Sequence, residues 1–473
     1  MARRKQGKKK RAAAGLERRE TGARAPASGE TEAAQARGGK RFWLPLAIVL
    51  AVIVVVVSVL FTRAEPGPLP FPPAAAGNAN AEVVVYEDFV GSDACAGCHT
   101  EQFQMWESST HGRAGGLPSS DVLITAFDGR AIRFKDAVVY PRTNSAGQYL
   151  FTVQQDNREP FDFVVAGVVG GGHMYGGGTQ GFLSAYPDGT LRFLPFDFIR
   201  IEGVWFCNTN TRTNEGWIPI TREMLLKDCG DWPPIRVFGT DERFGNCQEC
   251  HGSQVTIGFE RESGRFETRV KSLSINCESC HGPARAHVDL ANSGGLGGSE
   301  ELGVRPLGLL SEDESLEVCF QCHALKGVIE PGYLPGTPLQ DYYSLLMPLL
   351  GDRPLLPDGR VREFAYQQNH IASDCYLNGT MNCVDCHDPH SSSYRDIYSS
   401  PLIGRFDDRQ CTDCHASKAV APQLHTKHAV DSRGSQCVTC HMPFLQHPEV
   451  GSELGLPGPI IPYRYRGLRS IRD

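Results

Sequence analysis

Three short runs between residues 383 and 441 share one pattern: CVDCHDPH (383–390), CTDCH (411–415) and CVTCH (437–441). In each run two cysteines are separated by two residues, and a histidine follows the second cysteine. The same Cys-x-x-Cys-His unit occurs four more times upstream, so the chain carries seven units, which use fourteen of its seventeen cysteines. A histidine follows every Cys-x-x-Cys pair, and this regularity points to one chemistry for all seven units.

Each unit is the attachment site that a c-type haem requires, because the two thiols bond to the porphyrin edge and the adjacent histidine reaches the iron from one face. Structural zinc is the alternative, since zinc ribbons also pair Cys-x-x-Cys units. Zinc ribbons have no need for a histidine after every pair, so seven covalently bound haem c groups are predicted. Their attachment cysteines are Cys95 and Cys98, Cys247 and Cys250, Cys277 and Cys280, Cys319 and Cys322, Cys383 and Cys386, Cys411 and Cys414, and Cys437 and Cys440.

The histidines within the units are predicted to be the first axial ligands of the irons. They are His99, His251, His281, His323, His387, His415 and His441. The chain has fifteen histidines, so eight remain. Seven haems with two histidines each would need seven of these eight, and most haems are therefore predicted to be bis-histidine centres. Such irons have no free position for a substrate, which favours electron transfer over catalysis.

The second axial ligands are predicted among the remaining histidines. The candidates are His111, His173, His287, His370, His390, His425 and His428. His173 lies in a glycine-rich loop (170–178) beside Met174, a weaker candidate, and a loop histidine without a ligand role is the simpler alternative. His425 and His428 share a face if their segment is helical, so one is predicted to be a ligand and the other a surface or supporting group.

The predicted fold is mainly α-helical and irregular: a multihaem cytochrome core packed on its haems, with an antiparallel β insert and one N-terminal transmembrane helix. The chain contains 51 Gly and 31 Pro, and its cysteine-rich half lacks long periodic helices, so the haems are needed to complete the core. Strand-like runs lie between about 131 and 207, with a hairpin turn at Pro187-Asp188-Gly189. Ser311 and Glu314 predict a capped helix start.

The first 42 residues carry thirteen Lys and Arg against four Asp and Glu, a composition typical of a disordered tail. The uncharged stretch from Phe42 to Phe61 is long enough to span a bilayer as a helix, and the basic residues before it predict a cytoplasmic N-terminus. A cleaved signal peptide should have a shorter apolar core. The prediction is therefore a single-pass anchor in the inner (cytoplasmic) membrane, with a periplasmic or extracytoplasmic haem domain.

The predicted segments follow from these features. They are a basic cytoplasmic tail (1–41), a transmembrane anchor (42–62), a Pro/Ala-rich linker (63–90), the first haem segment (91–115), a β-rich insert (116–236) and a six-haem core (237–473). Among the three cysteines outside the attachment units, Cys207 and Cys229 are predicted to form a disulfide, with buried thiols as the alternative. Cys375 is then free.

The motifs resemble those of multihaem cytochromes c of the hydroxylamine-oxidoreductase-like superfamily, which includes tetrahaem and octahaem proteins. The resemblance covers about residues 91–445 and rests on WESSTH (106–111), CESCHGPARAH (277–287), CVDCHDPH (383–390) and CTDCH…LHTKH…CVTCHMP (411–443). It implies a mostly helical, loop-rich array of closely packed haem pairs. It also implies four distal ligands: His111, His287, His390, and one of His425 and His428.

Two departures from the family pattern matter. The similar pentahaem nitrite reductases replace one attachment histidine by lysine at the catalytic haem, whereas every unit here ends in histidine. Members of the family often continue past the last haem with an Asp-His-Ser segment, while this chain stops at Ile471-Arg472-Asp473. Either the protein lacks that ligand, which would leave one haem under-ligated, or the sequence is truncated.

The predicted function is that of a membrane-anchored, extracytoplasmic heptahaem cytochrome that carries electrons along a chain of haems. Its predicted partners are a quinol-linked membrane donor and a soluble cytochrome or reductase as acceptor. Nucleic acid is not expected, because the chain beyond its basic tail is acidic. The alternative is a reductase or oxidoreductase of small nitrogen or sulfur compounds at one open haem, and a structural haem scaffold is a weaker third. No catalytic residue is predicted.

Overall fold

The computed structural model describes most of the chain beyond residue 83. The described ranges are 84–171, 179–200, 203–207, 218–230, 232–239, 250–297, 302–324, 326–345, 370–371, 373–379, 381–441, 444–446 and 464–466, with the single residues Val52 and Gln368. Val83–Asp473 forms one compact unit and Met1–Glu82 another. Apart from Val52, all described residues belong to the first of these units.

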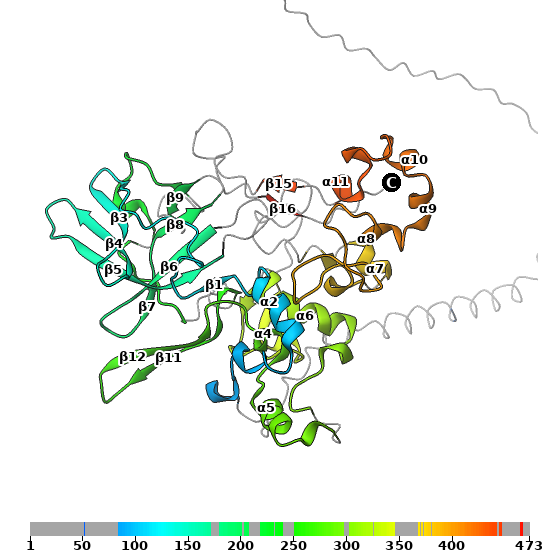
Figure 1. The fold of residues 1–473 in the computed structure, drawn as a ribbon, viewed down its shortest axis with the longest axis horizontal. Coiled ribbons are helices and arrows are strands. Elements are labelled where there is room, and N and C mark those ends of the chain that lie inside the picture. The colour runs from blue at the N-terminus through cyan, green and yellow to red at the C-terminus, as the bar shows by residue number, and fades with distance from the viewer. Residues whose placement is uncertain are drawn as a thin grey trace, which may run out of the picture. The chain divides into compact units, whose positions relative to one another are not determined.

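A ten-stranded sheet is the largest regular element of this unit (Figure 1). Eight strands follow one another in the order β10-β9-β8-β6-β5-β4-β3-β2, while β1 pairs with β5 and β7 with β6, and every pair is antiparallel. The strands are β1 (Gly115–Gly116), β2 (Ile132–Arg133), β3 (Ala137–Thr143), β4 (Tyr149–Gln155), β5 (Phe161–Val169), β6 (Thr179–Ala185), β7 (Leu191–Phe193), β8 (Phe196–Ile199), β9 (Val204–Cys207) and β10 (Ile218–Pro219).

Aromatic and β-branched side chains give this sheet an apolar core of its own. Phe151, Phe182 and Phe196 are fully buried, and the rings of Phe151 and Phe182 meet edge to face with centroids 5.2 Å apart. In the register of β3 and β4, Val139 lies opposite Val153, and both are fully buried. Burial of every second residue is what an alternating apolar pattern produces on a strand.

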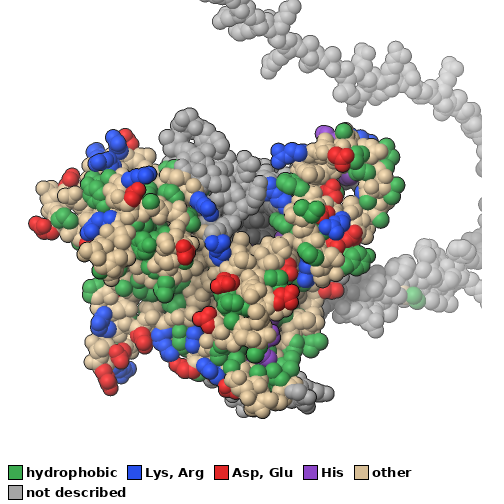
Figure 2. Space-filling model, viewed as in Figure 1, with side chains coloured by type: hydrophobic (Ala, Val, Ile, Leu, Met, Phe, Trp, Pro, Cys, Tyr) green, Lys and Arg blue, Asp and Glu red, His purple; other side chains and the backbone are tan. Residues whose placement is uncertain are grey.

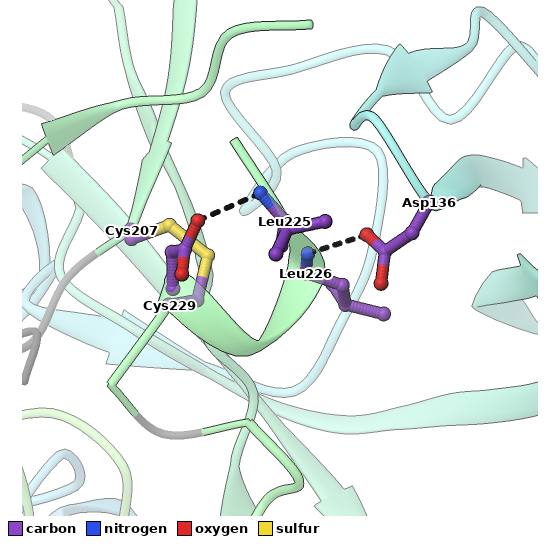
Figure 3. The surroundings of a disulfide bond; sticks show 6 residues. Asp136, Cys207, Leu225, Leu226 and Cys229 are labelled. Atoms are coloured by element: carbon purple, nitrogen blue, oxygen red, sulfur yellow. Dashed lines mark hydrogen bonds between the residues drawn. A yellow bond between two sulfur atoms is a disulfide. The ribbon is translucent and has the colours of Figure 1, made fainter. Parts of the chain in front are cut away.

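A disulfide closes one end of this core (Figure 3). It joins Cys207, the last residue of β9, to Cys229, with Cα atoms 5.3 Å apart, and both residues are fully buried. The 3-10 turn η3 (Leu226–Asp228) precedes Cys229, and the Leu226 N–H donates to the carboxylate of Asp136 at 2.8 Å. The predicted disulfide is thereby confirmed.

Replacing Cys207 and Cys229 together by serine is expected to lower the free energy of unfolding of the sheet by roughly 2–4 kcal/mol, because the bridge restricts the unfolded chain between them. Denaturant unfolding followed by far-UV circular dichroism would measure this change. Cys375→Ser, which removes a free thiol, is the matched control and should leave the midpoint near that of the wild type. Equal midpoints for all three proteins would contradict a stabilising role for the bond.

Outside the ten-stranded sheet the regular elements are short. The α-helices are α2 (Thr100–Ser108), α4 (Glu278–His281), α5 (Arg285–Asn292), α6 (Glu312–His323), α7 (Asp374–Gly379), α8 (Arg409–Thr412), α9 (Ala416–Val420), α10 (Pro422–Thr426) and α11 (Cys437–His441). The other 3-10 turns are η1 (Tyr86–Asp88), η2 (Ser92–Ala94), η4 (Gly295–Gly297), η5 (Leu307–Leu309), η6 (Leu339–Asp341), η8 (Cys383–Asp385) and η9 (Arg433–Ser435). Three two-stranded sheets complete the fold: β11 (Ser253–Glu260) with β12 (Arg265–Ser272), β13 (Lys326–Val328) with β14 (Tyr343–Leu345), and β15 (Phe444–Gln446) with β16 (Arg464–Arg466).

Two local predictions are confirmed by these elements. Helix α6 begins at the predicted capping box, where the Ser311 hydroxyl accepts the Glu314 N–H. The predicted turn at 187–189 connects β6 to β7, and Gly189 has a φ of +88° there. A Cβ at this glycine would lie 1.8 Å from the Phe266 carbonyl oxygen of β12, so only glycine lets the hairpin β11–β12 dock on the large sheet.

The prediction of a mainly α-helical and irregular protein is wrong, because the antiparallel sheet dominates the described structure. An attachment unit needs only about one turn of helix to bring two thiols and a histidine together, as α4 and α11 show. Seven such units therefore do not require long helices. The strands β1–β10 lie where the β insert was expected, but they form the largest regular part of the protein rather than a minor addition.

The membrane prediction is also corrected. The expected span at 42–62 lies outside the described residues except for Val52. Across the residues that the structure does describe, no helix has both the length and the apolar character needed to cross a bilayer; α6, the longest, has 12 residues, against about 20 for a span. The predicted single-pass anchor and inner-membrane location are contradicted by this finding and are not retained.

The surface is mixed in character. On the face shown in Figure 2, acidic and basic side chains are interspersed with apolar ones. This pattern fits a chain whose formal net charge is −7 in 473 residues.

Candidate haem-binding centres

Four attachment histidines each face a second histidine from another part of the chain. The ring centroids are 6.1 Å apart for His99 and His287, 6.2 Å for His323 and His111, 6.3 Å for His281 and His390, and 5.9 Å for His441 and His425. In every pair one ring belongs to a Cys-x-x-Cys-His unit and the other does not. All four partner rings are among the predicted second ligands.

These separations fit a metal ion held between two imidazoles. A metal–imidazole bond is about 2 Å long, so two imidazoles on opposite sides of one ion have ring centroids roughly 6 Å apart. Rings that pack directly also occur at such distances. Direct packing, however, gives no reason for an attachment histidine to meet a histidine outside the units four times. The residues present therefore fit haem iron with two axial histidines at these four centres.

Two of the partner rings already have one nitrogen bonded to a backbone carbonyl. His287 Nδ1 lies 2.7 Å from the Leu302 oxygen, and because a carbonyl only accepts, Nδ1 carries the proton and Nε2 is left for a metal. The His111 ring donates to the Pro389 carbonyl, and burial lowers the pKa of His111, which favours the neutral, metal-binding form. Metal-ligating histidines typically have such a second hydrogen bond.

Helix α2 and the segment before α4 together place His111. The indole Nε1 of Trp106 donates to the Ile275 carbonyl at 2.7 Å, and the Ile275 N–H donates to the His111 carbonyl at 3.2 Å. These bonds hold Trp106 and the backbone of His111 against the residues just before Cys277. The predicted distal ligand His111 is thus held by the backbone that leads into the unit at 277–281.

The attachment thiols of different units also meet in pairs. Hydrogen-bond contacts join Cys95 to Cys277, Cys250 to Cys322, Cys319 to Cys383, and Cys411 to Cys437. Cys280 and Cys319 also interact electrostatically without a hydrogen bond between them, as do Cys386 and Cys411. Each contact joins two different units, so neighbouring haem edges would lie side by side along the chain of centres.

A cavity of about 290 Å³ adjoins the last of these centres. Its lining includes Cys437, the first thiol of the last unit, and His425, the partner of His441. Arg409 and Lys418 add cationic side chains to the same wall. The cavity thus lies beside the thiol that would attach the last haem.

The remaining predicted ligands are placed differently. Both nitrogens of His370 are engaged within the protein, with Nε2 2.5 Å from the Met381 oxygen and Nδ1 3.4 Å from the Ser373 hydroxyl. His370 is buried, and these bonds join it to the segment that leads into α7; its role as a ligand stays a prediction. His428 is exposed and packs on Gly434.

Several predictions fall on residues that are not described, or on units without a matching pair. Cys247 and His173 lie outside the described residues. The ring of His387 lies 5.1 Å from that of Tyr394. For His251 and His415, the described part of the chain contains no ring pair with a second histidine comparable to the four above.

No family model matches the chain. The dissimilatory sulfite reductase MccA of Wolinella succinogenes is 21% identical over 410 residues, which cover 76% of this chain and 51% of the relative. This similarity, together with the seven Cys-x-x-Cys-His units, supports a multihaem c-type cytochrome. This cytochrome spans about half the length of that relative.

Two solved structures also align with this cytochrome. The outer cell wall cytochrome OcwA matches with a TM-score of 0.38 and 15% identity, over 78% of this chain and 73% of that one. The octahaem sulfite reductase MccA of Wolinella succinogenes matches with a TM-score of 0.36 and 16% identity, over 76% and 55%. TM-scores this low do not establish a shared fold.

Sequence reasoning missed two charged residues that are buried within or just after an attachment unit. Glu278 is 1% exposed and Lys326 is 4% exposed. The Lys326 Nζ lies 4.8 Å from the centroid of the Tyr343 ring, and its charge acts on the Cys322 thiol. The sequence shows only that both residues are close to attachment units: Glu278 lies inside one unit, and Lys326 follows another by three residues. Proximity alone does not reveal whether a charged side chain is buried.

Proposed function

We propose that this cytochrome is an electron carrier with seven covalently bound haem c groups, most of them with two axial histidines. The four histidine pairs carry the proposal, because an iron with two axial histidines has no vacant position and can exchange electrons but cannot bind a substrate directly. The seven attachment units in the sequence support the proposed number of haems.

The thiol contacts support a particular order of electron transfer. The unit at 95–99 adjoins the unit at 277–281, which leads through the unit at 319–323 to those at 383–387, 411–415 and 437–441. The unit at 247–251 joins this order beside Cys322. The proposed path therefore runs in a single line with one side branch.

Exposed cysteines lie at both ends of this path and in the unit before its last. Cys98, Cys414 and Cys440 are exposed, whereas the described cysteines of the units at 277–281, 319–323 and 383–387 are partly buried. Electrons are proposed to enter at one end and leave at the other, through redox protein partners. A quinol-linked donor and a soluble cytochrome or reductase are the proposed partner classes.

A second function is favoured by one set of observations. His251 is an attachment histidine without a matching ring pair in the described residues, and its unit adjoins Cys322, on which the buried Lys326 charge acts. A buried cation near an iron with a free position would suit a small oxyanion. Since the curated relative is named a sulfite reductase, reduction of a small sulfur or nitrogen oxyanion at that unit is the alternative proposal.

Haem counting and titration of the full chain, produced in a host that matures c-type cytochromes, test both proposals. The electron carrier predicts seven haems per chain by pyridine haemochrome, an oxidised spectrum that is mainly low-spin, and uptake of one electron per haem. Sulfite or nitrite should then leave the spectra unchanged. Conversion of a high-spin signal on adding sulfite or nitrite, with turnover of a reduced dye, would instead establish the enzyme.

A further inference from the structure

Glu278 is a carboxylate enclosed between two attachment units. It lies between Cys277 and Cys280 in the sequence, and its side chain is almost completely buried. Its Oε1 accepts hydrogen bonds from the Val90 N–H at 2.8 Å and the Ala284 N–H at 3.0 Å. Burying a carboxylate is costly unless hydrogen bonds replace its water. Backbone N–H groups supply that replacement here.

The third hydrogen-bond donor to the Glu278 carboxylate is the backbone N–H of a glycine in the left-handed conformation. The Gly91 N–H donates to Glu278 Oε2 at 2.7 Å, and Gly91 has a φ of +85°, which side chains other than glycine rarely adopt. The next residue, Ser92, lies with its hydroxyl 3.2 Å from both the N and the Sγ of Cys277. The segment just before Cys95 is thus tied to the start of the unit at 277–281.

This placement puts one negative charge beside two haem centres. The thiols of Cys95 and Cys277 are in contact, and the Glu278 carboxylate acts electrostatically on both. Each unit has its own histidine pair, His99 with His287 and His281 with His390. Because Glu278 itself is buried, its charge is screened less than a charge at the surface.

We propose that Glu278 is a positioning residue and a fixed negative charge shared by the haem centres at Cys95–Cys98 and Cys277–Cys280, and that it holds both reduction potentials below the values they would have without it. Reduction adds one electron to a centre, and a nearby negative charge disfavours that addition. Glu278 thereby makes the first two centres of the path stronger electron donors than their ligands alone would. This inference rests on the haem attachment proposed above.

Potentiometric titration of the holoprotein, with dithionite as reductant and ferricyanide as oxidant, tests the proposal. In Glu278→Gln, two components of the titration are expected to shift to higher potential, while the others stay at their wild-type positions. Glu101→Gln is the matched control. It removes one carboxylate two residues from His99, but Glu101 is exposed, so water and salt screen its charge and no component should shift.

A second variant separates the effect of the Glu278 charge on the reduction potentials from the role of its side chain in holding the segment at 90–92. Glu278→Asp keeps the charge on a shorter side chain, and its potentials should stay close to those of the wild type even if the segment at 90–92 loosens.

Unshifted potentials in Glu278→Gln with a full haem count would overturn the proposal. So would equal shifts in Glu278→Gln and Glu278→Asp, which would indicate a purely structural role. If Glu278→Gln fails to assemble, a shift of the same two components in Glu278→Asp would overturn it, and unshifted potentials would support it. A wild-type chain without haem would instead refute the proposed function.

Discussion

Replacement of His287 by glycine is expected to convert one low-spin haem of this cytochrome into a high-spin haem without loss of haem. The ring of His287 faces His99 at a centroid distance of 6.1 Å, and its Nδ1 is held by the Leu302 carbonyl. Glycine removes the ligating ring but leaves the thioether links through Cys95 and Cys98, so the iron keeps a single axial histidine. Electron paramagnetic resonance and resonance Raman spectra of the oxidised protein would show about one centre in seven changing spin state.

Two controls distinguish the loss of a ligand in His287→Gly from a general loss of folding. Added imidazole should fill the space left in His287→Gly and restore the low-spin spectrum, which a general loss of folding would not permit. His370→Gln is the matched histidine control, because His370 is bonded to Met381 and Ser373 rather than paired with an attachment histidine. A high-spin signal of equal size in both variants, or none in His287→Gly, would contradict the assignment of His287 as a ligand.

The chemistry of the centres could be predicted from the sequence because it is encoded locally. A Cys-x-x-Cys-His unit carries both thiols and the first ligand within five residues, and no knowledge of the fold is needed to recognise it. The distal histidines were harder, and the family motifs supplied His111, His287 and His390. Of the last two candidates, the ring of His425 lies opposite that of His441, and its role as a ligand stays a prediction.

The pairing of ligands could not be predicted, because it depends on contacts between distant segments. His99 meets His287, and His281 meets His390, although nothing in the spacing of the motifs distinguishes these pairs from others. The position of Glu278 is unpredictable for the same reason. A glutamate between two cysteines is equally compatible with an exposed side chain, and only the folded segment around Gly91 encloses it.

The error in fold class has a physical origin. The resemblance to multihaem cytochromes implied a mostly helical protein, yet the units occupy single turns such as α4 and α11. The alternating apolar residues of the insert, in contrast, pair into strands with a core of their own. The resemblance therefore overestimated the helical part, and the periodicity of the insert was the better guide to the fold.

The same contrast predicts that the two parts of the cytochrome depend on haem to different degrees. Helices α2, α5, α9 and α10 contain no buried residue, so little apolar burial holds them in place without a porphyrin. The sheet encloses fully buried side chains such as Phe151 and Phe182 and is closed by the disulfide. Helix α6 is intermediate, since its Leu316 and Phe320 pack with Leu339.

A chain in which all fourteen attachment cysteines are replaced by alanine is therefore expected to keep its sheet and lose its haem segments. Amide hydrogen exchange measured by mass spectrometry should show opening free energies of several kcal/mol in β3–β6, and close to zero in α2, α5, α9 and α10. In the holoprotein both sets should be protected, because covalent haem supplies the missing apolar core and couples folding to its attachment.

The retained disulfide provides the internal control, since Cys207 and Cys229 are not among the replaced cysteines. Reducing it in the haem-free chain should lower protection in the sheet alone, because the haem segments would already exchange freely. Two results would contradict this division. Protected α9 and α10 without haem would mean that these segments have a core independent of the porphyrin. Rapid exchange in β3–β6 would mean that the sheet is stabilised mainly by its contacts with the haem segments, such as the docking of β12 at Gly189, and not by its own aromatic core.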